Sequence, residues 1–234
     1  MSDTRSDYRL IVADHAASLL EEIVRTKRLP VPTNWQRAQE VAREIRGIVK
    51  RMRFSFMPPT MLARSEDAAR LVELVKELTG MLLNPQWIDR VRGDPRARKA
   101  LAETRYALRT LYSLPARLAL GDENDPFYAF DVECVTVTSV SKHPNADNLY
   151  VTHAKGRLAY TIVTNLADVR RGDVRAAVVL PPREFRGVVS EAMYCSRRSL
   201  AGEEGCEPGK RPPKRLVELG EIGAVLREIS RSVH

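Results

Sequence analysis

The side chains best suited to chemistry in this sequence are cations and amides, which are groups that bind phosphate and bases. Residues 141–151 form a turn-like segment in which Lys142, His143 and Asn145 surround a proline. Further along the chain, Arg183 and Arg186 flank an aromatic residue and precede a glycine. Arginine binds phosphate through two N–H groups and stacks on bases. Both segments are therefore candidates for contact with a nucleic acid.

Each of these residues also has a plainer structural interpretation. Pro144 fixes one backbone angle, and Asn145 and Asp147 can hydrogen-bond to their own backbone, so the segment can serve only to shape a turn. A structural role is the better interpretation of His143, and contact with phosphate or ribose is the alternative. Arginines such as Arg183 and Arg186 are as often solvated surface cations as phosphate ligands.

Further polar residues of the second half complete the candidate set for RNA binding. They are Lys155, Asn165, Arg170, Arg171 and Ser190. Tyr150 and Tyr160 are candidate stacking faces, with packing inside a barrel as the alternative. No Gly-rich phosphate loop and no His-Glu metal spacing accompanies these residues. The sequence therefore predicts a protein that is not an enzyme and that needs no metal or cofactor.

A second basic surface is predicted in the first half. Arg43, Arg46, Lys50 and Arg53 follow one another at spacings of 3, 4 and 3, which places them on one face of a helix. A run of charges is usually just a solvated face. Beside an RNA-binding domain, phosphate contact becomes a more plausible role, because nonspecific affinity grows with the number of phosphates neutralised.

Apolar residues show which elements must position these side chains. Up to about residue 113 they recur at spacings of 3 and 4, which predicts amphipathic helices. The main ones are expected at 7–27, at 35–53, at 65–79 with Gly80 as the stop, and behind Asp94-Pro95. Helices joined by short loops favour an antiparallel bundle.

After an acidic, turn-rich segment at 121–126, the apolar period changes to about two. The β-rich runs are 131–141, 149–156, 158–164, 174–180 and 191–196. Five short strands favour a small closed barrel of the oligonucleotide/oligosaccharide-binding (OB) type, because closure removes exposed edges. A short helix at 220–232 is expected to end the chain.

These patterns predict a two-domain α+β protein. We expect a basic helical bundle at 1–120, a linker at 121–130, an OB-fold barrel at 131–206 and a C-terminal extension at 207–234. The 38 Lys and Arg against 30 Asp and Glu give a net charge of +8. Residues 1–120 hold 22 basic and 14 acidic side chains, and the remaining residues hold 16 of each. The whole surplus therefore lies in the predicted bundle.

Composition also bears on the compartment. No apolar run approaches the ~20 residues that span a bilayer, and the N-terminus has no signal-peptide apolar core. We therefore expect a cytoplasmic protein without membrane association. Cys134 is interpreted as a small buried residue on a strand. Cys195 and Cys206 could pair, but two free thiols are the favoured interpretation in a reducing compartment.

Four segments resemble the tRNA-binding OB domain family. They are Ser141–Val151, Ile162–Asn165, Val169–Asp173 and the segment Arg186–Met193, which is similar to the family's "RGv.S.GM" pattern. The family includes stand-alone dimeric tRNA-binding proteins, C-terminal domains of methionyl-tRNA synthetases and the N-terminal insert of phenylalanyl-tRNA synthetase β subunits. The compact spacing is most similar to that insert. Two positions depart from the family pattern, since Ala192 replaces a usual Gly and Asn165 replaces a usual Gly or Ser.

The resemblance implies a non-enzymatic tRNA-binding protein. The barrel would recognise structured tRNA with electrostatic help from the basic helices, as an accessory factor beside an aminoacyl-tRNA synthetase. A homodimer is expected as well, because the stand-alone members dimerise through the barrel and its extension. The alternative is a protein-interaction or dimerisation module whose barrel is a scaffold with little affinity for RNA.

Overall fold

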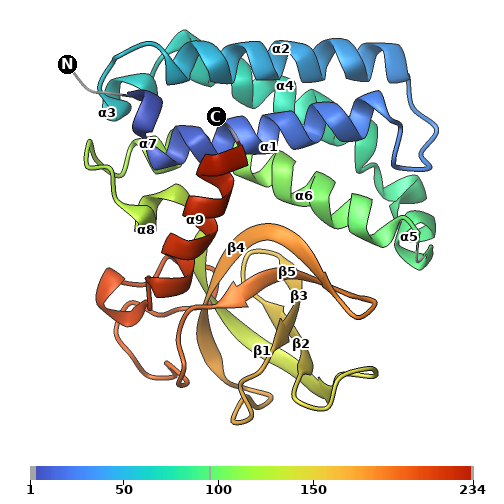
Figure 1. The fold of residues 1–234 in the computed structure, drawn as a ribbon, viewed down its shortest axis with the longest axis vertical. Coiled ribbons are helices and arrows are strands. Elements are labelled where there is room, and N and C mark those ends of the chain that lie inside the picture. Colours follow the sequence, from blue (N-terminus) through green and yellow to red (C-terminus); the bar gives the residue numbers. More distant parts are fainter. Residues whose placement is uncertain (1–3, 95, 233–234) are drawn as a thin grey trace. The chain divides into compact units, whose positions relative to one another are not determined.

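The chain folds into two compact units, one helical and one built on a β-sheet. The computed structural model describes residues 4–94 and 96–232, without the side chains of residues 90, 92, 221 and 232. The helical unit extends to Ala129 and includes the end of the chain from Leu226, and the second unit is Phe130–Val225. Figure 1 labels the elements of both units. In the described residues, no helix is both long and apolar enough to span a membrane.

Long amphipathic helices form the core of the helical unit. Helix α1 packs against α2 and α6, and α4 packs against the same two helices. The fully buried side chains include Leu20, Ile45 and Leu74, one from each of α1, α2 and α4. The bounds are η1 Thr4–Ser6, α1 Tyr8–Arg25, α2 Trp35–Arg53, α3 Pro59–Leu62, α4 Glu66–Leu82, α5 Pro85–Gly93, α6 Arg98–Tyr112, α7 Leu114–Leu118 and α8 Pro126–Ala129.

Side-chain caps determine where several helices begin. The side chains of Asp7, Asn34 and Ser65 each accept a backbone N–H from the first turn of α1, α2 and α4. Such caps satisfy N–H groups that have no partner within the helix. The predicted stop at Gly80 was wrong, because α4 continues to bury Leu82 one turn beyond Leu78.

The helix expected behind Asp94-Pro95 begins only at Arg98. The Asp94 carboxylate accepts the backbone N–H of Arg96 at 2.9 Å and so caps a turn in front of the helix. Pro95 itself lies outside the described residues.

The second unit contains one antiparallel five-stranded sheet with the order β3-β2-β1-β4-β5. This arrangement confirms the predicted fold class. The strands are β1 Val132–Lys142, β2 Tyr150–Lys155, β3 Ala159–Thr164, β4 Val174–Phe185 and β5 Val188–Tyr194, and α9 Gly220–Ser232 follows them. Strand β1 pairs with β4 in its first half and with β2 over the rest, and its register shifts between Val137 and Ser139.

Side chains, rather than a backbone ladder, connect the two edge strands. Backbone N–H groups of Thr161 and Val163 on β3 donate to the side chains of Glu191 and Ser190 on β5, both at 3.0 Å. The sheet therefore curls until β3 meets β5 but does not close completely, which makes it roughly OB-like.

The predicted linker at 121–130 is a folded part of the helical unit up to Ala129. It contains α8. The Asn124 side chain accepts from the N–H of Tyr8 and donates to the carbonyl of Ser6. The Asp122 carboxylate accepts both the N–H and the hydroxyl of Thr60, and these bonds lower the pKa of Asp122.

A disulfide joins Cys134 to Cys206, with 5.5 Å between their Cα atoms. The expectation that Cys206 is a free thiol, or that it pairs with Cys195, was therefore wrong. The fold explains the pairing, since the N–H of Cys134 donates to Lys210 O and its carbonyl accepts from Gly209 N. The segment after β5 thus returns alongside β1 and brings Cys206 to Cys134. Cys195 is a free, buried thiol, and burial raises its pKa to about 12.

We predict that the folded, unreduced protein resists alkylation at pH 8. Only a thiolate reacts, and with a pKa of about 12 the Cys195 thiol stays protonated at that pH. Iodoacetamide should label Cys195 alone after denaturation without reductant, and all three cysteines after denaturation with reductant. Peptide mass spectrometry reads the labelled positions. Labelling of Cys134 or Cys206 without reductant would contradict the disulfide.

Candidate nucleic-acid interface

Two turns that carry motif residues meet at one end of the barrel. One is the β1–β2 turn, residues 143–149, and the other is the β4–β5 turn at Arg186 and Gly187. Three side chains hold the two turns together, those of His143, Asn145 and Arg186. We call this region the loop end of the barrel and include in it residues 142–150, 164–165 and 183–187. Loops in these positions are where OB folds bind oligonucleotides.

His143 lies inside this junction. Its side chain is buried, its Nδ1 accepts the backbone N–H of Asn145 at 3.1 Å, and its Nε2 lies 2.9 Å from Phe185 O. Because Nδ1 acts as the acceptor, the ring proton is on Nε2 and is donated to the Phe185 carbonyl. Both ring nitrogens of His143 are therefore used within the junction, and its contact with RNA stays a prediction.

Asn145 and Arg186 bind each other's backbone. Asn145 Nδ2 donates to Arg186 O at 3.0 Å, and Arg186 Nη1 donates to Asn145 O at 2.8 Å. Arg186 has a positive φ of 45°, and φ of Gly187 is 93°. A positive φ is unusual for a residue with a side chain. The reciprocal hydrogen bonds hold Arg186 in this conformation and leave its side chain exposed.

The strand registers bring five predicted site residues to the loop end. Lys142 pairs with Tyr150, and Tyr150 pairs with Thr164 next to Asn165. Arg183 pairs with Ser190, whose hydroxyl reaches β3. The residues gathered there with exposed side chains are Lys142, Asn145, Asn165, Arg183 and Arg186.

The loop end combines positive charge with one exposed ring. Phe185 is 38% exposed and stands between the two arginines in sequence. The exposed carboxylates of Asp147 and Glu184 share this end with Lys142 and the arginines. The charge excess is therefore small, and binding here depends on the placement of the cations rather than on their number.

Three other predicted residues lie elsewhere. Lys155 is at the opposite end of β2, paired with Thr136 and Ala159. Arg170 and Arg171 are exposed on the β3–β4 loop. The backbone of this loop meets the middle of β1, where Gly172 N donates to Val137 O.

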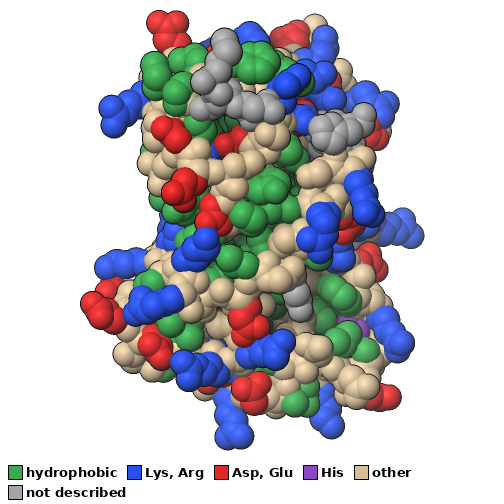
Figure 2. Space-filling view, turned by 60° about the vertical axis from the view of Figure 1, so that its left-hand side comes forward, with side chains coloured by type: hydrophobic (Ala, Val, Ile, Leu, Met, Phe, Trp, Pro, Cys, Tyr) green, Lys and Arg blue, Asp and Glu red, His purple; other side chains and the backbone are tan. Residues whose placement is uncertain are grey.

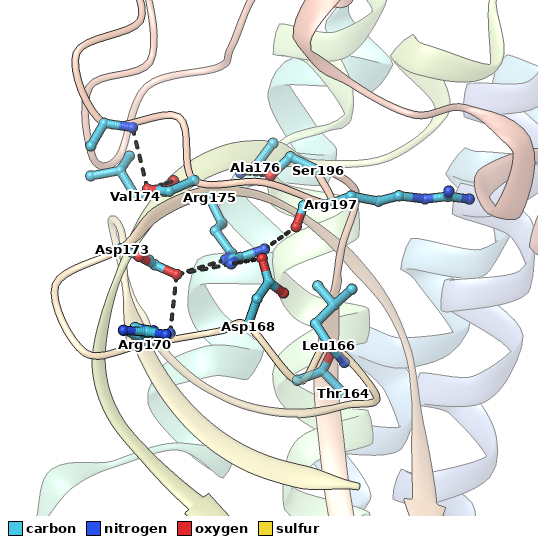
Figure 3. Close-up of polar contacts among 12 residues, drawn as sticks. Thr164, Leu166, Asp168, Arg170, Asp173, Val174, Arg175, Ala176, Ser196 and Arg197 are labelled. Carbon is cyan, nitrogen blue, oxygen red and sulfur yellow. Dashed lines mark hydrogen bonds and ion pairs between the residues drawn. The ribbon is translucent and has the colours of Figure 1, made fainter. Parts of the chain in front are cut away.

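A buried arginine that was not predicted holds the β3–β4 loop in place (Figure 3). Arg175 donates to the Asp173 carboxylate through Nε at 3.1 Å and Nη2 at 2.9 Å, and through Nη1 to the carbonyl of Arg197. The same Asp173 carboxylate accepts the backbone N–H of Arg170 at 3.0 Å. Arg175 thus positions the part of the loop that displays Arg170. Nothing in the alternation of residues 173–175 distinguishes this buried cation from exposed ones.

Ser190 and Tyr160 turn inward. The buried Ser190 hydroxyl accepts from Val163 N and donates to Ala192 O, so it bridges strands and does not face a ligand. The Tyr160 hydroxyl donates to the fully buried Glu133, and its ring is only 5% exposed. Ser190 therefore connects the two edge strands, and Tyr160 connects β3 to the buried carboxylate on β1.

The predicted basic row on α2 is only partly a free surface. Arg43 and Lys50 are exposed, whereas Arg46 pairs with Glu21 at 3.0 Å. Arg53 is buried and pairs with buried Asp14 at 2.7 Å. The last turn of α2 packs the Arg53 guanidinium against α1, so it adds no exposed charge to the predicted row.

Comparison with known proteins identifies both units. Residues 1–121, just over half of the chain, match the family model described as "Alpha helical domain". The chain belongs to the Alpha helical domain family. Residues 132–214 of this family member match the model described as "Putative tRNA binding domain". The second match confirms the resemblance based on the four motif segments. Neither matched description is that of a catalytic domain.

This Alpha helical domain protein is also similar to part of a synthetase subunit. It is 39% identical over 77 residues to the phenylalanine–tRNA ligase beta subunit of Leptospira biflexa serovar Patoc, covering 28% of this chain and 10% of that subunit. With the beta subunit of Thermotoga maritima it is 33% identical over 101 residues, covering 38% and 13%. The chain thus spans about a tenth of the length of these relatives.

We predict that Asn145→Ala loosens the junction of the two turns. Loss of one hydrogen bond, worth about 1 kcal/mol, should speed hydrogen exchange at the amides of Phe185 and Val188 about fivefold, as measured by NMR. Asn148→Ala is the matched control, since this exposed amide of the same turn makes no side-chain hydrogen bond within the described residues. Equal exchange rates in the two variants would contradict the role of Asn145.

Proposed function

We propose that this protein binds structured tRNA at the loop end of its barrel and has no catalytic activity of its own. The observation that carries the proposal is the junction of the two turns, which fixes Arg186 in an exposed position. Lys142 and Arg183 stand beside it to bind phosphates, and Phe185 offers a ring on which a base can stack. The match of residues 132–214 to a tRNA-binding domain model supports the same function.

The helical unit contributes electrostatic attraction in this proposal. Its exposed cations Arg43 and Lys50 add to the charge that draws in a polyanion. Arg170 and Arg171 on the β3–β4 loop, and Lys155 at the far end of the barrel, are proposed as secondary phosphate contacts. Structured RNA is recognised mainly through its shape and backbone, so contacts spread over a surface suit such a ligand.

Association with a synthetase is the second part of the proposal. The curated relatives that the chain matches include phenylalanine–tRNA ligase beta subunits, in which the matched region is about a tenth of the length. In this proposal the protein acts beside a synthetase as an accessory factor. Co-purification of the tagged protein with a ligase subunit, with and without ribonuclease, tests this association.

We also propose a homodimer, for which the barrel surface is the better candidate. The apolar face of α9, the expected dimer contact, is already covered within the chain, since Ile222, Leu226 and Ile229 are at most 3% exposed. The predicted interaction module would therefore need another surface. Light scattering over a range of concentrations decides between monomer and dimer.

We predict that the double variant Arg183→Gln, Arg186→Gln binds bulk tRNA about tenfold more weakly or worse in a filter-binding assay. Each lost phosphate contact should also lower the slope of log affinity against log salt by about one. Glutamine removes both charges, and because Arg186 also donates to Asn145 O, the hydrogen-exchange measurement described for Asn145→Ala verifies that the junction of the two turns is kept.

The matched control is Arg197→Gln, Arg198→Gln. It removes the same charge from two exposed arginines of the same unit that lie outside the loop end. An equal loss in both double variants would show that only total charge matters. Unchanged binding in the loop-end variant would rule out the proposed site.

A further inference from the structure

The helical unit has its own cluster of exposed apolar side chains where α2 turns into α3. We call residues 53–61 the α2–α3 corner. Phe54 is 52% exposed, Phe56 39% and Met61 56%. In Figure 2, in which the side of the molecule bearing α3 comes forward, hydrophobic side chains lie on the surface at its upper end. Exposed apolar clusters of this kind mark binding surfaces more often than chance placements do.

The backbone at this corner is strained in a way that displays a ring. Phe56 has a positive φ of 58°, which is a true outlier for a bulky residue. Its backbone N–H donates to the hydroxyl of buried Thr4 at 3.1 Å. Strain of this kind persists only where the surroundings enforce it, and it concentrates at functional sites. Here the enforced conformation keeps an aromatic ring partly in solvent.

Each ring also carries a guanidinium group on one side. The Cζ atom of Arg5 lies 5.5 Å from the centroid of Phe56, and that of Arg53 lies 5.6 Å from the centroid of Phe54. The Arg53 guanidinium is itself held by an ion pair with Asp14. Such cation–π contacts fix the orientation of a ring. Both rings are therefore oriented as well as exposed, which reduces the entropy lost when a flat ligand stacks on them.

The charged residues of the sequence around the α2–α3 corner are all basic. Residues 45–65 contain five basic residues and no acidic residue. Arg51 pairs with Asp67 from α4, and Asp122 accepts from Thr60. Exposed Lys50 and Arg64 have no carboxylate partner among the described residues. The corner thus combines exposed rings with uncompensated cations.

We propose that the α2–α3 corner binds unpaired nucleotides of RNA, with Phe54 and Phe56 as stacking faces and Lys50 and Arg64 as phosphate contacts. Aromatic faces interleaved with cations are the usual means by which proteins hold single strands. An uncharged apolar partner fits less well, because it would leave the exposed cations Lys50 and Arg64 without an anion. The corner belongs to the helical unit and the loop end to the second unit, so each can be tested by substitutions that leave the other unchanged.

Binding of a fluorescein-labelled dodecamer of uridine to the full-length protein, followed by fluorescence anisotropy, tests the proposal. The ring-deleting variants are Phe54→Leu, which keeps the apolar volume, and Phe56→Asn, which removes the ring with a residue that tolerates positive φ. We expect each to weaken binding about fivefold or more, because a stacked base loses its partner ring. Circular dichroism verifies the fold of each variant.

Two controls make the outcome decisive. Leu158→Ala removes a similarly exposed apolar side chain from the barrel and should leave the affinity unchanged. Arg183→Gln, Arg186→Gln should weaken binding of tRNA more than binding of the dodecamer, whereas the ring-deleting variants should do the reverse, which separates failure of the loop end from failure of the corner. Wild-type affinity in Phe56→Asn, or in Phe54→Leu, would overturn the stacking proposal. If Phe54→Leu kept the wild-type affinity for the dodecamer and Phe54→Ala lost it, the corner would need apolar volume and not a ring. That result would indicate an apolar protein-docking surface instead.

Discussion

The barrel's ligand-binding end depends on the need of main-chain polar groups for partners. The β4–β5 turn presents the carbonyls of Phe185 and Arg186 at the end of the sheet. His143 and Asn145, about forty residues earlier in the chain, donate to these two carbonyls. The side chain of Arg186 returns a bond to the Asn145 carbonyl. The role of these motif side chains within the chain is thus to hold the two turns together. Only polar groups that make no such bond, in these and in neighbouring side chains, remain available to a ligand.

The same division of labour applies to the arginines. Arg9 and Arg175 are almost completely buried and bind carboxylates and carbonyls that connect distant segments. Arg53 does so between α1 and α2. Breaking a buried pair is costly, because it leaves one charge without a partner. A high arginine content in this chain thus reflects internal cross-linking as well as attraction for anions.

Periodicity and capping residues were sufficient to predict most elements, because each acts locally. The limits of α2 and its cap Asn34, and the positions of all five strands, could be predicted in this way. Contacts between residues far apart in the sequence could not be predicted in this way. The burial of Arg53, the inward turn of Ser190 and the pairing of Cys134 depend on which strands and helices become neighbours. The exposure of Phe54 and Phe56 could not be predicted either, because it depends on how the turn after α2 folds, with Phe56 at a positive φ.

The bond between Cys134 and Cys206 also determines how the chain would respond to mechanical force. The two cysteines are 72 residues apart and enclose nearly the whole sheet. A force applied to the two ends of the chain would therefore be borne by this covalent bond near the start of β1 instead of by the hydrogen bonds of β5. About 250 Å of potential extension would stay hidden inside the loop. The barrel would resist being drawn through a narrow unfolding pore until the disulfide is reduced.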